Sequence, residues 1–525
     1  MTIYSFSPFG YEGALVTVEV DLRRGIPATD MVGLADGAVR ESRERVRAAV
    51  QNSGLNFPLE RILISLSPAD VKKEGAGFDL AIALAVLAAA DSGANGDGHA
   101  AANGAVLVMG ELELSGKVRP VRGIHAAVES ALEQGITRCI VPQANAPEAQ
   151  TQGMHTLAAD SLAVAWAALC ASPEAWGPSR QSAPSAQRSP AETVDFPPPS
   201  GACEFAEVKG QPALVRGLQI AAAGGHNLLA YGPPGCGKTL ALSRFPALLP
   251  LLTSEEARPV TRIHSLAGNM PHGQPLIRVP PFRMPHQSTS LEGMTGGGKN
   301  CGPGEISLAH HGVLFLDEAA EFKVNVLQSL RVSLETGTVT VSRAGRSSVY
   351  PASYQLLIAT NPCSCGNFGS PGKVCVCSMR SVEQYWRKFS APLLDRIDIR
   401  IPVFPPASAS RSHAAPGTVP PALLTTAGLR RPIAHAVAAQ RCRQGKRNQF
   451  LLPEELSHCC LVDDDASQEL DMAVSACGFS PRARASCLKL ARTIADMEGS
   501  GTIRQEHMAE AISFRKNEGV LSFDF

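Results

Sequence analysis

The chain has 525 residues, 44% of them hydrophobic, and its 48 basic and 48 acidic side chains give a formal net charge of zero. This length predicts two to four domains, each large enough to bury a core. The even charge balance excludes a surface that is basic throughout, so any nucleic-acid site must be a local stripe of positive charge.

The first residues contain no basic segment followed by an apolar run, which predicts the absence of a signal peptide. The longest apolar stretch, residues 80–90, is too short to span a bilayer and is typical of a buried helix. Fourteen cysteines without a secretion signal favour reduced thiols or metal ligands over disulfides. We therefore expect a cytoplasmic protein with no membrane partner.

An N-terminal domain is predicted over residues 1–171, and its mixture of strands and helices predicts an α+β or α/β class. Its apolar patterns predict strands near 14–20 and 61–65 and helices near 38–53, 78–90 and 124–134. Residues 172–200 are rich in Pro, Ser, Ala and Gln, which predicts a linker to the next domain.

A glycine-rich loop follows the apolar run 227–231 and precedes a helix-like stretch at 240–249. This is the strand–loop–helix context of a phosphate-binding loop, in which backbone N–H groups close around phosphate oxygens. Lys238 is placed to pair with the β- and γ-phosphates of a nucleotide, and Thr239 to bind Mg²⁺. The predicted nucleotide-binding residues are Gly232, Pro233, Pro234, Gly235, Cys236, Gly237, Lys238, Thr239 and Leu240.

Two further predicted strands end in polar residues suited to nucleotide chemistry. The apolar run 313–316 ends in Asp317 and Glu318, one acid to organise Mg²⁺ and one to activate water. The run 355–360 ends in Asn361, an amide able to orient the attacking water. Alternating strands and helices predict a parallel sheet with its ligands at the carboxyl ends of the strands. Nucleotide hydrolysis is the leading hypothesis.

These motifs, together with Leu-Leu-Asp-Arg-Ile-Asp at 393–398, resemble AAA+ ATPases of the magnesium-chelatase clade. Residues 282–286 with 296–298, and residues 303–312, resemble the ComM/YifB family of competence-related DNA branch-migration helicases, and the likeness covers nearly the whole chain. It implies an AAA+ core over 201–425, a C-terminal helical lid over 426–525, ATP and Mg²⁺ as ligands, and a homo-hexameric ring. It also implies sequence-independent binding of single-stranded or branched DNA during natural transformation.

The resemblance also implies roles for individual residues. Asp317 would support Mg²⁺, Glu318 would be the general base, and Asn361 would be the first sensor residue. Arg482 would be the second sensor, in contact with the nucleotide, and Arg396 would be the arginine finger that reaches a neighbouring subunit. The alternatives are an intramolecular salt bridge for Arg396 and a helix-surface position for Arg482.

Stretches in the N-terminal domain, at 73–80, 110–118 and 120–124, resemble the Lon protease domain, which has a ribosomal S5 domain 2-like fold. A Ser–Lys protease requires a serine nucleophile and a lysine that deprotonates it. Those two positions fall near Gly77 and His125, so a catalytically inactive domain is expected, serving as a scaffold or a DNA-handling module. Ser115 and Lys117 lie close in sequence but lack an orienting partner.

Two Cys-x-Cys pairs follow the predicted first sensor. Four thiolates gathered by a short loop suit tetrahedral Zn²⁺, which predicts a structural zinc site; the alternative is four reduced cysteines. The predicted ligands are Cys363, Cys365, Cys375 and Cys377.

Residues 337–350 predict a β-hairpin with Arg343 and Arg346 flanking its turn. In the chelatase clade this hairpin faces the channel of the ring, so these arginines, with Lys299 of the glycine-rich insert, are the predicted DNA contacts. The alternative is a pair of solvated turn arginines.

The C-terminal tail predicts four helices, near 430–445, 466–477, 481–497 and 504–515. Ser480 is a suitable N-cap and Pro481 suits a first helical turn. The basic residues Arg441, Arg443, Lys446 and Arg447 are typical of a solvated face.

Four functions therefore compete: a DNA motor, a magnesium-chelatase motor subunit, an ATP-dependent protease, and an ATP-gated assembly factor. The fused N-terminal domain argues against the chelatase subunit, and the Gly77 and His125 positions argue against the protease.

Overall fold

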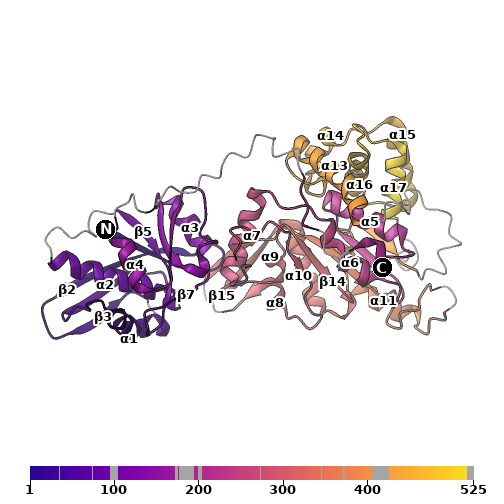
Figure 1. Ribbon diagram of the computed structural model, residues 1–525. Coiled ribbons are helices and arrows are strands. Elements are labelled where there is room, and N and C mark those ends of the chain that lie inside the picture. Colours follow the sequence, from indigo (N-terminus) through magenta and orange to yellow (C-terminus); the bar gives the residue numbers. More distant parts are fainter. Residues whose placement is uncertain are drawn as a thin grey trace.

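The computed structural model describes residues 1–34, 36–73, 75–94, 104–171, 176, 194–198, 204–271, 273–298, 300–343, 346–370, 373–404 and 425–516, without the side chains of residues 38, 92–94, 343 and 346. Figure 1 shows an N-terminal sheet with its helices, a second sheet surrounded by helices, and a group of helices at the C-terminal end. The predicted linker lies almost wholly outside the described residues.

The N-terminal sheet has seven strands in the order β3-β4-β2-β1-β5-β8-β9, with β2 antiparallel to both β1 and β4. Its outermost strand at one end, β3, runs parallel to β4, and β5, β8 and β9 run parallel to β1 or to each other. The strands are β1 (Thr2–Ser7), β2 (Ala14–Arg23), β3 (Ala28–Val32), β4 (Arg61–Ser67), β5 (Ala105–Val108), β8 (Arg138–Pro142) and β9 (His155–Ala159). The mixed α/β composition predicted for this part of the chain is confirmed.

The helices of this part are α1 (Gly37–Asn52), α2 (Asp79–Ala94), α3 (Ile124–Glu133) and α4 (Leu162–Cys170). The side chain of Asp36 caps α1 by accepting a hydrogen bond from the backbone of Val39 at 2.9 Å. The apolar stretch 80–87 of α2 is buried, as the sequence predicted. A two-stranded ribbon, β6 (Glu111–Leu112) and β7 (Val118–Arg119), lies beside it.

The second sheet is entirely parallel, with the order β11-β14-β17-β10-β18. Its strands are β10 (Leu228–Tyr231), β11 (Phe282–Arg283), β14 (Val313–Leu316), β17 (Gln355–Thr360) and β18 (Ile399–Pro402). The three central strands are fully buried, because helices cover both faces. Strand β17 has the bounds that the sequence predicted.

Helices and short strands surround this sheet. They are α5 (Pro212–Gly224), α6 (Lys238–Ser243), α7 (Ser254–Ala267), α8 (Leu291–Thr295), α9 (Glu305–Leu308), α10 (Val324–Thr336), α11 (Met379–Arg387), α12 (Ala391–Leu394), and the ribbon β12 (Gly296–Gly297) with β13 (Gly302–Pro303). The single helix predicted at 240–249 is wrong: α6 ends at Ser243, and a 3₁₀ turn (Phe245–Leu248) follows it. Pro246 has no N–H for an α-helical bond and disfavours the helical conformation in the residue before it.

The C-terminal helices are α13 (Thr426–Gln444), α14 (Pro453–Cys459), α15 (Asp464–Cys477), α16 (Pro481–Glu498) and α17 (Gln505–Arg515). All four predicted helices are present, and α14 is additional. Ser480 caps α16 as predicted, accepting from the backbone of Ala483 at 3.1 Å.

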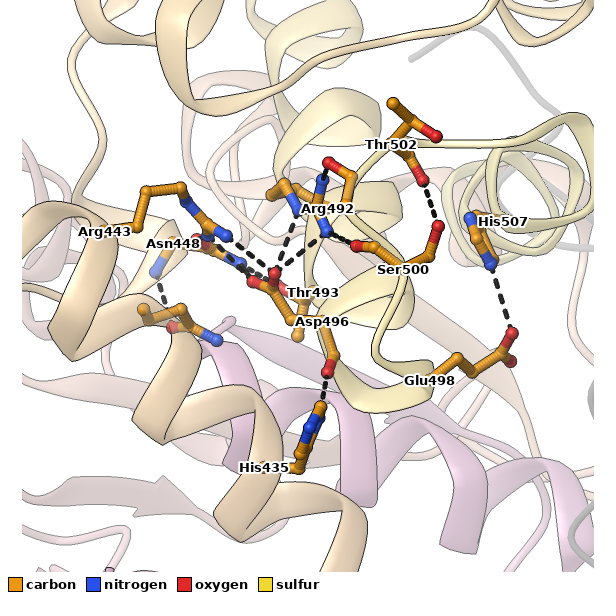
Figure 2. A network of polar contacts seen from close by, with 12 residues as sticks. His435, Arg443, Asn448, Arg492, Thr493, Asp496, Glu498, Ser500, Thr502 and His507 are labelled. Atoms are coloured by element: carbon orange, nitrogen blue, oxygen red, sulfur yellow. Dashed lines mark hydrogen bonds and ion pairs between the residues drawn. The ribbon is translucent and has the colours of Figure 1, made fainter. Parts of the chain in front are cut away.

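The basic cluster predicted as a solvated face is half-exposed or exposed in the structure, and three of its side chains also pair with neighbouring elements. Arg443 donates to both carboxylate oxygens of Asp496, at 2.7 and 2.8 Å (Figure 2). Lys446 pairs with Glu455 at 2.7 Å, and Arg447 donates to the backbone carbonyl of Ala222 at 2.8 Å. Two of these partners, Asp496 and Ala222, are distant in the sequence, so local patterns do not indicate them.

The N-terminal domain contacts the second sheet's helices through α3, which packs on α7. Arg262 of α7 donates to the carboxylate of Glu129 at 3.1 Å, and Ser265 of α7 hydrogen-bonds Glu148 at 2.5 Å. These bonds are largely buried, so the two parts are held together by specific polar contacts in addition to apolar packing.

A second contact joins the loop 9–13 of the N-terminal domain to the predicted hairpin, which is formed by β15 (Thr338–Arg343) and β16 (Arg346–Pro351). The backbone N–H of Tyr11 donates to the Ser348 hydroxyl at 2.9 Å. Gly10 has a positive φ and lies so close to Ser348 that any side chain there would collide.

The hairpin itself is confirmed, with Arg343 opposite Arg346 in backbone register. The side chains of both arginines, and the whole of Lys299, lie outside the described part of the chain, so their predicted DNA contacts stay predictions. None of the helices within the described ranges combines the length and the apolar character needed to cross a bilayer.

Candidate functional site: a nucleotide pocket and a separate pair of arginines

The phosphate loop connects β10 to α6 at the carboxyl edge of the parallel sheet. Gly235 and Gly237 have φ values of 79° and 87°, a region that side chains other than glycine's rarely occupy. A side chain on Gly232 would collide with the backbone carbonyl of Val403. Three glycines are thus required by the path of the loop, which leaves its N–H groups and the α6 N-terminus free to face a phosphate.

Lys238 lies at the start of α6 and is buried. Its amine donates to the carbonyls of Gly232 and Pro233, at 2.6 and 2.9 Å, and to the side-chain oxygen of Asn361 at 3.3 Å. Desolvation lowers the pKa of the amine from its usual value. The amine is therefore held within the loop by exchangeable hydrogen bonds, in reach of a phosphate that enters the pocket.

The adjacent strand β14 brings both acidic residues to the same edge. The Thr239 hydroxyl donates to a carboxylate oxygen of Asp317 at 3.1 Å, and the same oxygen accepts the backbone N–H of Glu318 at 3.1 Å. Glu318 has a left-handed backbone, with φ of 47°, which is uncommon for a non-glycine residue and turns the chain sharply after the strand. A hydroxyl beside a carboxylate is the usual protein donor set for Mg²⁺ at a phosphate loop.

One cavity of about 330 Å³ collects these groups. The lining includes ten of the residues named from the sequence: Pro234, Gly235, Cys236, Gly237, Lys238, Thr239, Leu240, Asp317, Glu318 and Asn361. Gly232 and Pro233 lie behind it as acceptors for Lys238. The motifs that the sequence scatters over 130 residues therefore meet at one point, and the donor set suits a magnesium-bound nucleotide.

The two predicted arginines lie elsewhere. Arg396 and Arg482 line a second cavity, of about 700 Å³, formed between α10, α12 and the start of α16. Both approach Glu335, with Nη2 atoms 2.6 Å and 3.8 Å from its carboxylate oxygens. The intramolecular salt bridge considered for Arg396 is therefore present, and Arg482 is partly exposed.

No arginine belongs to the described residues that line the nucleotide cavity. A transition state for phosphoryl transfer carries charge that arginines commonly stabilise. Within one chain, Arg396 and Arg482 share a cavity with each other, not with Lys238 and Glu318.

The four cysteines of the two Cys-x-Cys pairs also meet. Their Sγ atoms lie within 4.8 Å of one another, with Cys363 at 3.4 Å from Cys365 and at 3.7 Å from Cys375. A tetrahedral Zn²⁺ with Zn–S bonds of about 2.3 Å holds its sulfurs about 3.8 Å apart. Backbone N–H groups of Asn367 and Val376 lower the pKa of the Cys365 thiol to about 6. The geometry fits a structural zinc ion.

This cysteine loop lies against the nucleotide pocket. Cys363 follows Asn361 by two residues, and a side chain on Gly366 would meet the Pro234 ring of the phosphate loop. The indole N–H of Trp386 donates to the carbonyl of Pro362 at 2.9 Å and fixes the chain between them. An ion in the loop would therefore stiffen the backbone that carries Asn361.

The residues considered for proteolysis are not arranged for it. Ser115 hydrogen-bonds Glu113 at 3.2 Å and also accepts a weak contact from the backbone of Lys117, so its hydroxyl has no lysine base among the contacts of the described residues. His125 is buried on α3, 3.4 Å from Glu129.

Comparisons with known families match three consecutive parts of the chain. Residues 18–145 match "Subunit ChlI of Mg-chelatase", residues 204–411 match "Magnesium chelatase, subunit ChlI", and residues 424–515 match its C-terminal family. The first match covers most of the N-terminal sheet without β1 and β9, the second covers the parallel sheet, and the third covers the C-terminal helices.

Relatives are similar over almost the entire chain. The uncharacterized protein YifB of Escherichia coli is 38% identical over 530 residues, covering 99% of this chain and 97% of its own. The competence protein ComM of Haemophilus influenzae is 35% identical over 517 residues, covering 98% and 97%. The magnesium-chelatase 38 kDa subunit of Acidiphilium rubrum is 28% identical over only 30% of this chain and 52% of its own. The chain belongs to the ComM/YifB family of magnesium-chelatase-like AAA+ proteins.

Proposed function

We propose that this protein is an ATP-driven, ring-shaped DNA motor that promotes branch migration during recombination in natural transformation. The observation that carries the ATPase part is the single cavity shared by Lys238, Thr239, Asp317, Glu318 and Asn361. Full-length similarity to a protein named for competence supports the DNA part.

In the proposed reaction, the loop N–H groups and Lys238 bind the phosphates of ATP, and Thr239 and Asp317 hold Mg²⁺. The ion neutralises phosphate charge when it is bound. Glu318 accepts a proton from the attacking water, and Asn361 orients that water from the neighbouring strand. Lys238 exchanges its loop carbonyls for phosphate oxygens, which costs little because each neutral acceptor is replaced by a charged one.

The arginines complete the site between subunits. Arg396, as the finger, and Arg482, as the second sensor, serve the nucleotide of the next chain, because both lie away from their own phosphate loop. A head-to-tail contact of this kind closes into a ring, and we propose a homo-hexamer.

DNA would pass the β15–β16 hairpin, whose arginines Arg343 and Arg346, with Lys299, contact phosphates without reading bases. The remaining parts are proposed as supports. Residues 1–171 form an inactive Lon-protease-like domain, 172–200 a linker, 201–425 the AAA+ core and 426–525 a helical lid. Cys363, Cys365, Cys375 and Cys377 hold structural zinc, and the ring works in the cytoplasm.

The deciding experiment measures ATP hydrolysis with and without branched DNA and follows a three-strand or four-way junction over time. Junctions should be resolved only with ATP and Mg²⁺, and DNA should stimulate hydrolysis. Lys238→Ala should lose nucleotide binding, whereas Glu318→Gln should bind ATP and stall. Replacing both Arg343 and Arg346 by Ala should weaken binding to all sequences and reduce the salt slope by roughly one to two units.

A chelatase-type motor is the second candidate, favoured by the family to which residues 204–411 and 424–515 match. It predicts ATP hydrolysis that DNA leaves unchanged and intact junctions. That result, with an active Lys238 site, would reject the helicase and retain the AAA+ motor.

A further inference from the structure

A single carboxylate, Glu335, holds both arginines of the second cavity. Its Oε2 atom lies 2.6 Å from Nη2 of Arg396, and its Oε1 atom lies 3.8 Å from Nη2 of Arg482. The Glu335 side chain is 50% exposed, whereas that of Arg396 is 8% exposed. The carboxylate therefore lies at the mouth of the cavity and pairs with two cations, one from the turn after α12 and one from the start of α16.

Arg396 is incompletely satisfied in this position. One Nη atom donates to the carbonyl of Pro392 and the other to Glu335, while the buried Nε atom has no hydrogen-bond partner in the described structure. A guanidinium that leaves one donor unused is not in its best environment, and a bidentate acceptor such as a phosphate would use its donors more fully. The pair with Glu335 is therefore exchangeable.

Glu335 is also joined to the hairpin that is the proposed DNA contact. It occupies the last turn of α10, Gly337 caps that helix, and β15 begins at Thr338. The Thr336 hydroxyl donates to the carbonyl of Thr338 at 3.0 Å and accepts the Thr338 N–H at 3.2 Å.

The root of the hairpin is also tied to the end of α10. Val339, Val341 and Tyr350 are buried in the core beneath it, and Ala352 donates to the carbonyl of Gly337 at 2.7 Å. A displacement of the hairpin therefore moves the end of α10 with it, because no flexible segment separates them.

We propose that Glu335 is a positioning residue that restrains Arg396 and Arg482 until the hairpin engages DNA, a role that rests on the proposed ATPase and DNA functions. While paired with the carboxylate, the two arginines are partly neutralised and are held away from a neighbour's phosphates. A shift of the hairpin withdraws Glu335 from the arginines, which then reach the neighbouring nucleotide.

The test compares Glu335→Gln with the wild-type full-length chain. The amide keeps the shape and removes the charge, so turnover without DNA should rise about two- to fivefold, the rate equivalent of releasing an exposed ion pair. The DNA-stimulated rate should stay the same, so the factor by which DNA stimulates should fall by the same amount. Glu335→Asp, which keeps the charge, should restore most of the low basal rate.

Asp471→Asn is the matched control, because Asp471 is an exposed helix carboxylate that pairs with Arg484 at 3.2 Å outside the cavity. It should leave both rates unchanged. Adding Arg396→Ala to Glu335→Gln should abolish the rise, because the released group would be missing.

Basal turnover that is unchanged or lower in Glu335→Gln, with ring mass and melting temperature as in the wild type, would overturn the role. So would a rise that persists without Arg396 or appears equally in Asp471→Asn. Glu318→Gln in the same assay separates the proposed ATPase site from the proposed role of Glu335. If the wild type is active and Glu318→Gln is inactive, the ATPase site stands even where the role of Glu335 fails. An inactive wild type overturns both proposals.

Discussion

Two carboxylates of this molecule each pair with two arginines, and they differ in almost every other respect. Asp496 of α16 is 2% exposed and accepts from Arg443, Arg492 and Asn448 at 2.7 to 3.0 Å (Figure 2). Glu335 of α10 is half exposed, and one of its two arginine contacts is long, at 3.8 Å.

The difference in exposure and in contact distances indicates that the Asp496 network has a structural role and that the Glu335 pair can rearrange. Arg492 uses its other donors on the carbonyls of Gly501 and Ser500, so the groups around Asp496 are saturated. A buried and satisfied network holds one arrangement, because breaking any bond leaves an unpaired polar group. The pair of Glu335 with Arg396 is exposed on its acidic side only and leaves one donor of Arg396 unused, so a ligand can replace it at lower cost.

The largest expected effect is on catalysis. Arg396→Ala should lower ATP turnover by about 10³-fold or more, the range known for arginine fingers. Its melting temperature should stay close to that of the wild type. Arg443→Ala should do the reverse, with a clear loss of thermal stability in the C-terminal helices and turnover retained at low temperature. Steady-state kinetics and calorimetry on both variants check this, and similar turnover losses in the two would erase the distinction.

A smaller effect is expected on stability. Asp496→Asn leaves two arginines without their counter-charge and should lower the free energy of unfolding of the C-terminal helices by about 3–5 kcal/mol. Glu335→Gln should cost less than about 1 kcal/mol, as exposed pairs do. Urea unfolding followed by far-ultraviolet circular dichroism measures the free energy of unfolding of both variants. Equal losses in Asp496→Asn and Glu335→Gln would contradict the difference between the two networks.

The effect of pH extends the comparison to His310, a buried histidine with no acidic partner among the described residues. Burial lowers the pKa of His310 to about 3, and its Nδ1 atom accepts the backbone N–H of Ser353 at 3.0 Å. The unfolded chain binds this proton below pH 6.5 whereas the folded chain does not, so the stabilisation is complete above pH 6.5 and declines toward pH 3. Between pH 7 and pH 5 the loss should be about 2 kcal/mol.

His310→Asn, which keeps an acceptor for Ser353 and does not titrate, should remove that part of the pH dependence in urea unfolding. The same substitution at the exposed His286 is the control and should leave the wild-type profile in place. If the free energy of unfolding of His310→Asn depends on pH as in the wild type, another group is responsible for the loss of stability in acid.

The smallest expected effect is a local change in the cysteine loop. Cys375 and Cys377 are half-buried, and their replacement by Ser should remove about one zinc per chain. Hydrogen exchange at residues 361–377 should accelerate, while the parallel sheet keeps its protection. Elemental analysis and exchange mass spectrometry give the two readouts, and metal-free wild-type protein purified without chelator would favour plain thiols.

The sequence was informative where local rules suffice. The phosphate loop, the strand at 355–360, the hairpin and the Ser480 cap each depend on residues within one short segment. The break of the predicted 240–249 helix was also visible, because Pro246 lies in it. The cysteine cluster was predictable from spacing alone.

Long-range pairings were beyond such rules. Glu335 carries no motif, and its role depends on Arg396 and Arg482, which are 61 or more residues away. The bond of Arg443 to Asp496, 53 residues further on, was equally invisible to local patterns. Likewise, nothing in the motifs of Arg396 shows that it lies in a different cavity from Lys238; only the folded chain separates the two.

The contact between Tyr11 and Ser348 sets an order of events during translation. The two residues are 337 positions apart, and the N-terminal sheet is complete once β9 ends at Ala159. At ordinary ribosomal speed, Ser348 is synthesised on the order of tens of seconds after Ala159. During that interval the loop 9–13 and the α3 face are solvated on a folded domain, and docking follows as a separate step. Newly made chains therefore pass through a stage in which the first domain is finished and the hairpin has yet to be anchored.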